Sequence, residues 1–265
     1  MCSGVNQPNI DSMTKFEDHF SKLAIEYSLY RPKYPDGLFK YLADVVPDTH
    51  LAWDCGTGNG QAAIQLANHF QRVHATDASP HQIARAAGHP RVEFRVETAE
   101  NVSLESSSVD LVTVAVAVHW FDLDRFYREV ERVLKPGGVL AVWTYHLPRI
   151  EPVIDRVIET YAWSVLGEYW PDRIRYVDEK YKTLPFPLQE FKPPHFEMCS
   201  EWDLNRFVGY ISSWSAVNGY IERHRSHPVE EIWEDLKSAW MKEDVVRELR
   251  WELYFRMGRN GDAEL

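Results

Sequence analysis

Cysteine, positive charge and long apolar runs are all scarce in this chain of 265 residues. The three cysteines, Cys2, Cys55 and Cys199, lie far apart and form no CxxC pair. This pattern predicts neither a disulfide framework nor a metal site and fits a reducing cytoplasm. No apolar run approaches the length of a membrane span, and the first stretch, "MCSGVNQPNIDSM", lacks the basic and apolar regions of a signal peptide. Met13 is a second candidate start.

Basic residues are outnumbered, with 29 Lys and Arg against 40 Asp and Glu, so the formal net charge is −11. Such a chain repels a phosphate backbone unless basic residues gather locally, and only short basic clusters such as the one at Arg223 and Arg225 are present. A nucleic-acid partner is therefore disfavoured, and the lack of a long apolar run disfavours insertion into a membrane. A small-molecule partner is expected, and the sequence leaves monomer and homodimer open.

Apolar spacing predicts an alternation of strands and helices in the first part of the chain. A helix is expected from Phe16 to Tyr27, ending before the two prolines of "YRPKYP". Five strands are then predicted at 51–55, 72–77, 91–97, 109–118 and 139–145. Helices are expected between them at 61–70, from Ser79 and Pro80 to Gly88, and at 124–134, with "KPGG" as a turn. Alternation of this kind predicts a parallel sheet covered on both faces.

The alternation of strands and helices ends after residue 147, and a long helix is predicted at 153–165. A strand at 195–202, helices at 204–214 and 232–240 and a one-sided strand at 251–257 follow. We expect one domain with these parts: a flexible tail 1–15, a helical lid 16–50, a core 51–146, a cap insertion 148–194 and a completion of the sheet 195–265.

A glycine loop follows the first predicted strand in "LAWDCGTGNG", residues 51–60. Glycines there allow backbone to approach a nucleotide at the carboxyl end of a parallel sheet. Asp54 precedes the first glycine, where it would repel a pyrophosphate but accept a hydrogen bond from an ammonium. Asp77 ends the second strand, the place of a carboxylate that accepts ribose hydroxyls. A ribose and an amino acid in one ligand indicate S-adenosylmethionine.

The ordered motifs "LAWDCGTGNG", "HATDAS", "VETAENV", "DLVTVAVAVHWFD" and "LKPGGVLAVWTY" closely resemble those of class I S-adenosylmethionine-dependent methyltransferases. "FSKLAIEYSLYRPKYP" and "HWFD" resemble more narrowly the small-molecule group of type 11, trans-aconitate methyltransferase-like proteins. The resemblance covers about residues 16–146. It implies a Rossmann-like, doubly wound, mostly parallel seven-stranded sheet with an antiparallel strand near the carboxyl terminus and a helical cap insertion.

The resemblance also implies roles for individual residues. Asp54 and the backbone of Gly56 and Gly58 would hold the methionine portion, Asp77 the ribose, and Thr98 and Ala99 the adenine, although the family often has an acid where Thr98 stands. A carbonyl near Ala117 would meet the methionine amino group. The whole set expected at the cofactor is Tyr27, Arg31, Asp54, Gly56, Thr57, Gly58, Gly60, Asp77, Ala78, Thr98, Ala99, Glu100 and Ala117.

His119, at the end of the fourth strand, is the candidate catalytic base, with a structural role in orienting the loop as the alternative. Tyr30, Trp120 and Tyr145 are expected at the acceptor. Arg31 would grip a carboxylate or form a surface ion pair. Two other functions stay open: a nicotinamide-dependent oxidoreductase, against which Asp54 and the glycine spacing argue, and a non-catalytic cofactor-binding adaptor.

Overall fold

The structure, a computed structural model, describes residues 30–261. The predicted tail 1–15, the helix from Phe16 to Tyr27 and the role of Tyr27 lie outside the described residues. The described chain forms two compact units, which we treat separately. The sheet unit comprises residues 33–149, 171–200 and 249–261, and the helical unit comprises residues 30–32, 150–170 and 201–248.

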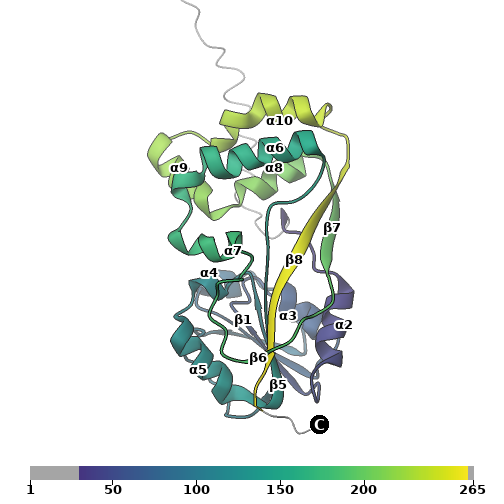
Figure 1. Ribbon diagram of the computed structural model, residues 1–265, viewed down its shortest axis with the longest axis vertical. Helices are drawn as coiled ribbons and strands as arrows, with labels where there is room; N and C mark the ends of the chain where they lie inside the picture. The colour runs from purple at the N-terminus through teal and green to yellow at the C-terminus, as the bar shows by residue number, and fades with distance from the viewer. Residues whose placement is uncertain (1–29, 262–265) are drawn as a thin grey trace, which may run out of the picture. The chain divides into compact units, whose positions relative to one another are not determined.

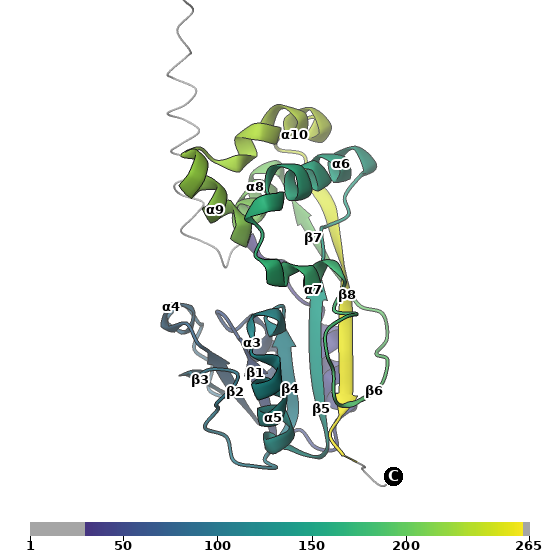
Figure 2. The ribbon, with the colours of Figure 1, turned by 60° about the vertical axis from the view of Figure 1, so that its left-hand side comes forward.

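The sheet has a continuous path of strands in the order β3-β2-β1-β4-β5-β8-β6, and β7 also pairs with β8. Strands β1 to β5 run parallel, as the alternation predicts. β8 is antiparallel to β5, and the two lie side by side where Val139 to Tyr145 pairs with Arg259 to Leu253 (Figure 2). The strand bounds are Leu51–Cys55, Arg72–Asp77, Val92–Val96, Val109–Ala115, Leu134–Tyr145, Gln189–Glu190, Glu197–Trp202 and Arg247–Arg259 for β1 to β8.

Helices cover both faces of this sheet, with α2 and α3 on one side and α5 on the other (Figure 1). Trp53 of β1, Val112 of β4 and Leu140 of β5 share a buried cluster with Phe126 and Val130 of α5. Because neighbouring residues of a strand point to opposite faces, a strand buried along its whole length packs against both layers. The helical segments of this unit are α2 Asp36–Asp44, α3 Gln61–Leu66, α4 Pro80–Ile83, η2 Val118–Trp120, α5 Leu123–Val133, η5 Asp172–Ile174 and α7 Arg175–Asp178.

The helical unit is held together by aromatic side chains. Phe207 stacks on Trp240 with ring centroids 5.5 Å apart, and Tyr161 packs on Trp214 at 5.6 Å. Its segments are α6 Pro152–Thr160, the π-helical turn Tyr161–Val165, η4 Gly167–Tyr169, α8 Leu204–Ser212, α9 Ser215–His224, η6 Pro228–Ile232 and α10 Trp233–Trp240. Across residues 30–261, none of the helices is both long and apolar enough to cross a membrane.

Three local predictions are wrong, and the helix predicted at 61–70 ends early, at Leu66. "KPGG" is not a turn between elements, because it lies inside β5 as a bulge: β5 advances from Leu134 to Val139 while β4 advances only from Val109 to Leu111. The predicted helix from Ser79 to Gly88 ends at Ile83, since α4 has no buried face to extend it. The fourth strand ends at Ala115 instead of residue 118, because Val116 takes a left-handed φ of +54°.

The division into units also differs from the predicted boundaries. Residues 171–200, expected mostly in the cap, group with the sheet, whereas α8, α9 and α10, expected to complete the sheet, group with α6. The reason is that the helical unit draws its aromatic core from two separate stretches of chain, so no single insertion builds it.

A buried carboxylate ties the start of β1 to the bulge in β5. Asp110 has no exposed surface, accepts hydrogen bonds from the backbone N–H groups of His50 (3.0 Å) and Leu51 (2.9 Å), and pairs with Nζ of Lys135 at 2.6 Å. We predict that Asp110→Ala lowers the free energy of unfolding by about 3 kcal/mol, because a buried donor and a cation lose their partner. Urea denaturation followed by circular dichroism measures the change.

Asp44→Ala is the matched control, since Asp44 forms an exposed pair with Lys40 at 2.5 Å on α2. Exposed pairs of this spacing contribute about 0.5 kcal/mol or less. Equal losses in the two variants would contradict the role given to Asp110.

Candidate active site

The glycine loop after β1 packs tightly between the ends of β2 and β4. A Cβ built on Gly56, whose φ is +68°, would lie 2.6 Å from Cβ of Ala117, so only glycine fits this approach. The N–H of Thr57 donates to the carbonyl of Thr76 at the end of β2 (2.9 Å). Gly58, with a φ of +58°, has open space where its side chain would be. The loop thus lies where the strand order reverses, which is where ligands bind in open α/β sheets.

Asp54 supports this loop from beneath. It has no exposed surface, and its oxygens accept hydrogen bonds from Oγ1 of Thr57 (2.6 Å) and Oγ1 of Thr113 (2.7 Å). Burial raises the pKa of this carboxyl to about 6, although the two threonines and the backbone N–H of Ala63 oppose the rise. These contacts hold the loop, and the ammonium contact expected of Asp54 stays a prediction.

Asp77 joins the loop to the next helix from the end of β2. Its two oxygens accept hydrogen bonds from the N–H of Gly58 (2.9 Å) and the N–H of Ser79 (2.8 Å). An ionised carboxylate has about four acceptor positions, so each oxygen can accept one further hydrogen bond. Ala78, beside it, is exposed.

The turn after β3 meets the segment after β4. Thr98 is exposed and bridges to Asn101, whereas Ala99 is buried. The carboxylate of Glu100 accepts a hydrogen bond from the N–H of Asp122 at 2.9 Å. The predicted adenine residues are therefore brought to the same edge of the sheet as the glycine loop.

His119 and Trp120 follow β4 in the short helix η2. Their rings pack together with centroids 4.9 Å apart, but His119 is 3% exposed and Trp120 48%. Burial, helped by the positive charge of Arg173, lowers the pKa of His119 to about 4. The imidazole is therefore neutral at pH 7. The carbonyl of Ala117 accepts a hydrogen bond from the N–H of Trp120 (2.9 Å) and has a second lone pair available.

Two residues that the sequence analysis missed contact this helix. The hydroxyl of Tyr181 lies 3.0 Å from Nδ1 of His119. Nη1 of Arg173 donates to the carbonyl of Phe121 at 2.9 Å and to that of His119 at 3.5 Å. Both belong to the stretch predicted to form the cap, and nothing in its apolar spacing distinguishes them from surface or core residues.

The remaining predicted residues lie elsewhere. Tyr145 ends β5 in the sheet unit and is half-buried. Tyr30 and Arg31 belong to the helical unit: the ring of Tyr30 packs on Gly209, and Nη2 of Arg31 donates to the carbonyl of Ser213 at 3.4 Å. The structure thus brings together the predicted residues that follow β1 to β4, while the contacts expected of Tyr145, Tyr30 and Arg31 stay predictions.

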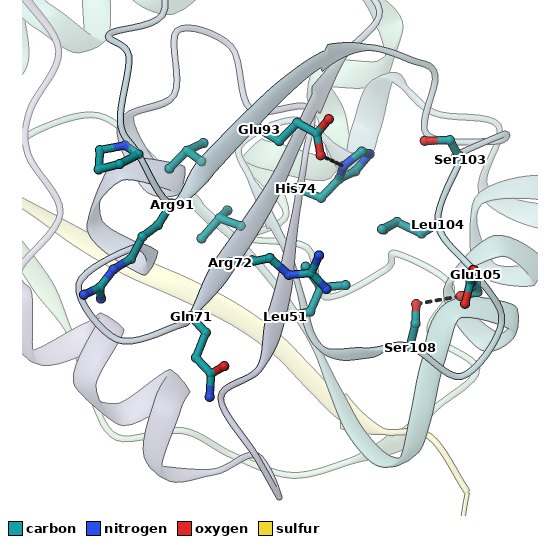
Figure 3. Close-up of a pocket in the computed structure, with 13 residues that line it drawn as sticks. Leu51, Gln71, Arg72, His74, Arg91, Glu93, Ser103, Leu104, Glu105 and Ser108 are labelled. Carbon is teal, nitrogen blue, oxygen red and sulfur yellow. Dashed lines mark hydrogen bonds and ion pairs between the residues drawn. The ribbon is translucent and has the colours of Figure 1, made fainter.

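A polar cleft of about 430 Å³ opens at the other end of the strands, beside Leu51, Arg72 and Val92 (Figure 3). Its polar groups largely satisfy one another or the backbone: His74 lies between Glu93 (3.9 Å) and Glu97 (3.1 Å), and Ser108 donates to the carbonyl of Glu105. This cleft is at the amino ends of β1 and β2, so it is separate from the glycine loop.

A mostly parallel sheet of this order, with β8 antiparallel, a glycine loop after β1 and a carboxylate at the end of β2, indicates a nucleotide-cofactor enzyme of the class I methyltransferase type. Sequence comparison agrees: the model of the family described as "Methyltransferase domain" matches residues 53–142. A Dictyostelium discoideum protein named as a methyltransferase is 34% identical over 239 residues, covering 89% of this chain and 91% of its own. A Saccharomyces cerevisiae protein named as an S-adenosylmethionine-dependent methyltransferase is 25% identical, with 88% and 94% covered.

A solved structure titled as a type II methyltransferase from Anaeromyxobacter dehalogenans is 41% identical, with a TM-score of 0.81 over 87% of this chain and 98% of its own. The chain belongs to the S-adenosylmethionine-dependent methyltransferases. Its cofactor is S-adenosylmethionine, which leaves S-adenosylhomocysteine as product. The oxidoreductase and adaptor alternatives therefore no longer apply.

The described residues fit this cofactor in two respects. Asp77 retains an acceptor position on each oxygen, which suits the two hydroxyls of a ribose. The open side of Gly58 leaves backbone uncovered at the carboxyl end of β1.

We predict that Asp77→Asn weakens binding of S-adenosylhomocysteine by about ten- to a hundredfold, because charge-assisted hydrogen bonds are lost. Isothermal titration measures the affinity. Asp48→Asn is the control, since Asp48 is exposed and accepts a hydrogen bond from the N–H of Thr49. Unchanged affinity in Asp77→Asn would contradict a ribose contact.

Buried histidines predict stability that rises with pH between about 4 and 6.5. Burial lowers the pKa of both His119 and His227 from 6.5 to about 4. In this window each of these histidines is protonated in the unfolded chain but not in the folded chain. Both therefore lower the free energy of unfolding as the pH drops from 6.5 to 4, against a smaller opposite contribution from Asp54, whose pKa burial raises to about 6. His119→Asn should remove the contribution of His119 to this decrease in the free energy of unfolding, which is up to about 3 kcal/mol.

Urea denaturation at pH 7 and pH 4.5 measures this difference. His195→Asn is the control, because the side chain of His195 is 63% exposed. A pH dependence in His119→Asn as steep as in the unmodified chain would contradict a buried neutral imidazole.

Proposed function

We propose that this methyltransferase acts on a small molecule through an oxygen or nitrogen nucleophile, and that His119 accepts the proton which the nucleophile loses. The observation that carries the proposal is the packing of Ala117 and Phe121 against Gly56, which sets the segment of His119 beside the cofactor loop. The net charge of −11 argues further against a nucleic-acid acceptor.

The cofactor residues are part of this proposal. Asp77 would hold the ribose, and the backbone of Gly56 and Gly58 the methionine portion. Thr98 and Ala99 would contact the adenine, and the carbonyl of Ala117 the amino group. Asp54 would act through Thr57 by keeping the loop in place. We propose that the other members of the set lie at the edges of the cofactor site: Tyr27, Arg31, Gly60, Ala78 and Glu100.

When bound, S-adenosylmethionine supplies an electrophilic methyl group, so the chain's own task is to orient a nucleophile and exclude water. Trp120 offers an exposed aromatic face beside His119 and would support a flat or apolar acceptor. Tyr145 and Tyr30 are proposed as further acceptor contacts. His119, neutral at pH 7, would receive the proton.

A small carboxylate is the second candidate acceptor. Arg31 favours it, since its guanidinium is half-buried over the ring of Tyr210, 5.7 Å from the centroid, and a planar guanidinium suits a carboxylate. An ionised carboxylate has no proton to lose, so methylation of it would not depend on His119.

The test is a panel of phenols, amines, carboxylates, RNA and peptides, incubated with the chain and S-adenosylmethionine carrying a labelled methyl group. We predict turnover in the small-molecule arms. For an acceptor that loses a proton, His119→Asn should lower kcat by about 10²- to 10⁴-fold and leave the affinity for S-adenosylhomocysteine unchanged. His195→Asn should match the unmodified chain.

Turnover confined to RNA or peptides would overturn the small-molecule assignment. Equal losses of kcat and cofactor affinity in His119→Asn would remove the case for a base. If the unmodified chain and His119→Asn methylate a carboxylate equally well, the acceptor is the second candidate, a small carboxylate.

A further inference from the structure

The strand β3 gives the sheet an open edge. It ends the path of strands, and among the strands of residues 30–261 it pairs only with β2 (Figure 2). At one end of this pairing the N–H of Val73 donates to the carbonyl of Arg91, at 2.8 Å. At the other end the N–H of Glu97 donates to the carbonyl of Asp77, at 3.2 Å. Arg91 and Glu97 therefore direct these backbone groups toward β2.

The backbone on the outer side of β3 is free to pair with another strand. Successive residues of a strand direct their N–H and C=O groups to opposite sides, so the odd-numbered residues from 91 to 97 face β2. The even-numbered residues Val92, Phe94 and Val96 face outward. The N–H of Val92 donates to the carbonyl of His89 at 3.0 Å, and the other outward groups have no hydrogen bond to any of the described residues. Groups exposed in this way form a template for a further strand.

The side chains of this segment are complementary about Phe94. The segment reads "RVEFRVE" over residues 91–97. Residues at equal distance from Phe94 are either two valines or a Glu and an Arg. If a second copy of β3 lies antiparallel with a two-fold axis at Phe94, each Glu93 faces Arg95 of the other copy, and each Val92 faces Val96. A strand of this sequence is thus complementary to itself.

The charged residues of β3 are exposed and can bind a second partner. The side chains of Glu93 and Arg95 are each 57% exposed, and within one chain Nε of Arg95 donates to Oε1 of Glu93 at 2.8 Å. Glu93 also lies 3.9 Å from Nδ1 of His74. An ionised carboxylate has about four acceptor positions, so Glu93 can accept from a second guanidinium. On the opposite face, Val96 is 53% exposed and would be covered by Val92 of the other copy.

We propose that two copies of this chain form a symmetric dimer in which their β3 strands pair antiparallel about Phe94. In that pairing the two Phe94 residues exchange two hydrogen bonds through their N–H and C=O groups. Each N–H of Val96 donates to the C=O of Val92 in the other copy. Glu93 and Arg95 of both copies then lie together on one face, with charges that alternate in sign.

The charges also select this register over its neighbours. A two-fold axis moved by one residue, to Glu93 or to Arg95, would place two carboxylates or two guanidinium groups opposite each other. Like charges directly opposite each other destabilise a strand pair. A foreign strand would match this edge only if it carried the same order of charges around an apolar residue. The chain has that order in its own β3, so a second copy is the expected partner.

This dimer leaves each cofactor site within its own chain. The glycine loop and Asp77 lie at the carboxyl ends of β1 and β2, which run parallel to β3. Antiparallel pairing of β3 directs the carboxyl ends of the two sheets in opposite directions, so neither site needs a residue of the other copy. The proposal is therefore independent of the methyl acceptor and of the role of His119.

Charge reversal tests the pairing in the intact chain. Sedimentation velocity over a range of protein concentrations should give a dimer for the unmodified chain. Glu93→Arg and Arg95→Glu each place like charges opposite each other at two symmetric positions, so each should raise the dissociation constant by about tenfold or more. Asp44→Arg is the matched control, since Asp44 is an exposed carboxylate paired with Lys40 on α2, and this variant should dimerise as the unmodified chain does.

Mixing the two variants separates a lost contact from a lost fold. Glu93→Arg has positive charge at both positions and Arg95→Glu has negative charge at both, so an equal mixture should form a heterodimer. The double variant, Glu93→Arg with Arg95→Glu, restores opposite charges across the axis and should dimerise again. Failure of both the mixture and the double variant to dimerise would overturn the pairing.

Amide hydrogen exchange locates the interface. The N–H of Phe94 should exchange more slowly as the protein concentration rises, because it is hydrogen-bonded only in the dimer. A monomer at every concentration would overturn the proposal, as would a dimer in which this N–H exchanges as fast as in the monomer. Slow exchange that does not depend on concentration would mean that a segment of the same chain, outside residues 30–261, occupies the edge, and would overturn the proposal too.

Discussion

The site depends on one buried carboxylate. Asp54 lies at the end of β1 with no exposed surface, where an ionised group is costly unless it is hydrogen-bonded. Thr57 and Thr113 supply these bonds, one from the glycine loop and one from β4. The loop, β1 and β4 are therefore linked at the point where the strand order reverses. Without this link, nothing else described would tie the side chain of Thr57 to the sheet.

The same region of low solvent access affects the two titratable groups in opposite ways. Burial raises the pKa of Asp54 to about 6 and lowers that of His119 to about 4, because in each case the charged form is disfavoured. For Asp54 this works against its ionised form, and the two threonines compensate. For His119 it favours the neutral imidazole, which the proposed proton acceptor needs.

Much of the sheet could be predicted from sequence because the composition of its strands indicates that they are buried. β1 and β4 are mostly apolar and are buried along almost their whole length, and parallel strands buried on both faces have that composition. The glycine loop and Asp77 could likewise be predicted, since their place at the ends of strands follows from the alternation alone. The bulge at Gly137 could not, because it depends on the register of β5 against β4 and on contacts with Asn260.

The residues around His119 mark the limit of sequence reasoning. Its own position after β4 could be read from the alternation. Tyr181 could not, because its place depends on a left-handed backbone in a segment without periodicity and on the hydrogen bonds of Arg256. The sequence does not indicate which aromatic residues of the second half contact the sheet. Nor does it indicate which of them pack among α6, α8 and α10.

In the proposed role of His119, a pKa of about 4 makes it a weak base, and this constrains when the proton moves. A phenol or amine in its ground state gives up a proton reluctantly to so weak an acceptor. As its oxygen or nitrogen bonds to carbon, however, positive charge develops on that atom and its proton becomes strongly acidic. A weak, neutral acceptor is then sufficient, and proton transfer follows the formation of the new bond instead of preceding it. The burial of His119 suits this order, since it keeps the imidazole unprotonated until the acceptor's proton is released.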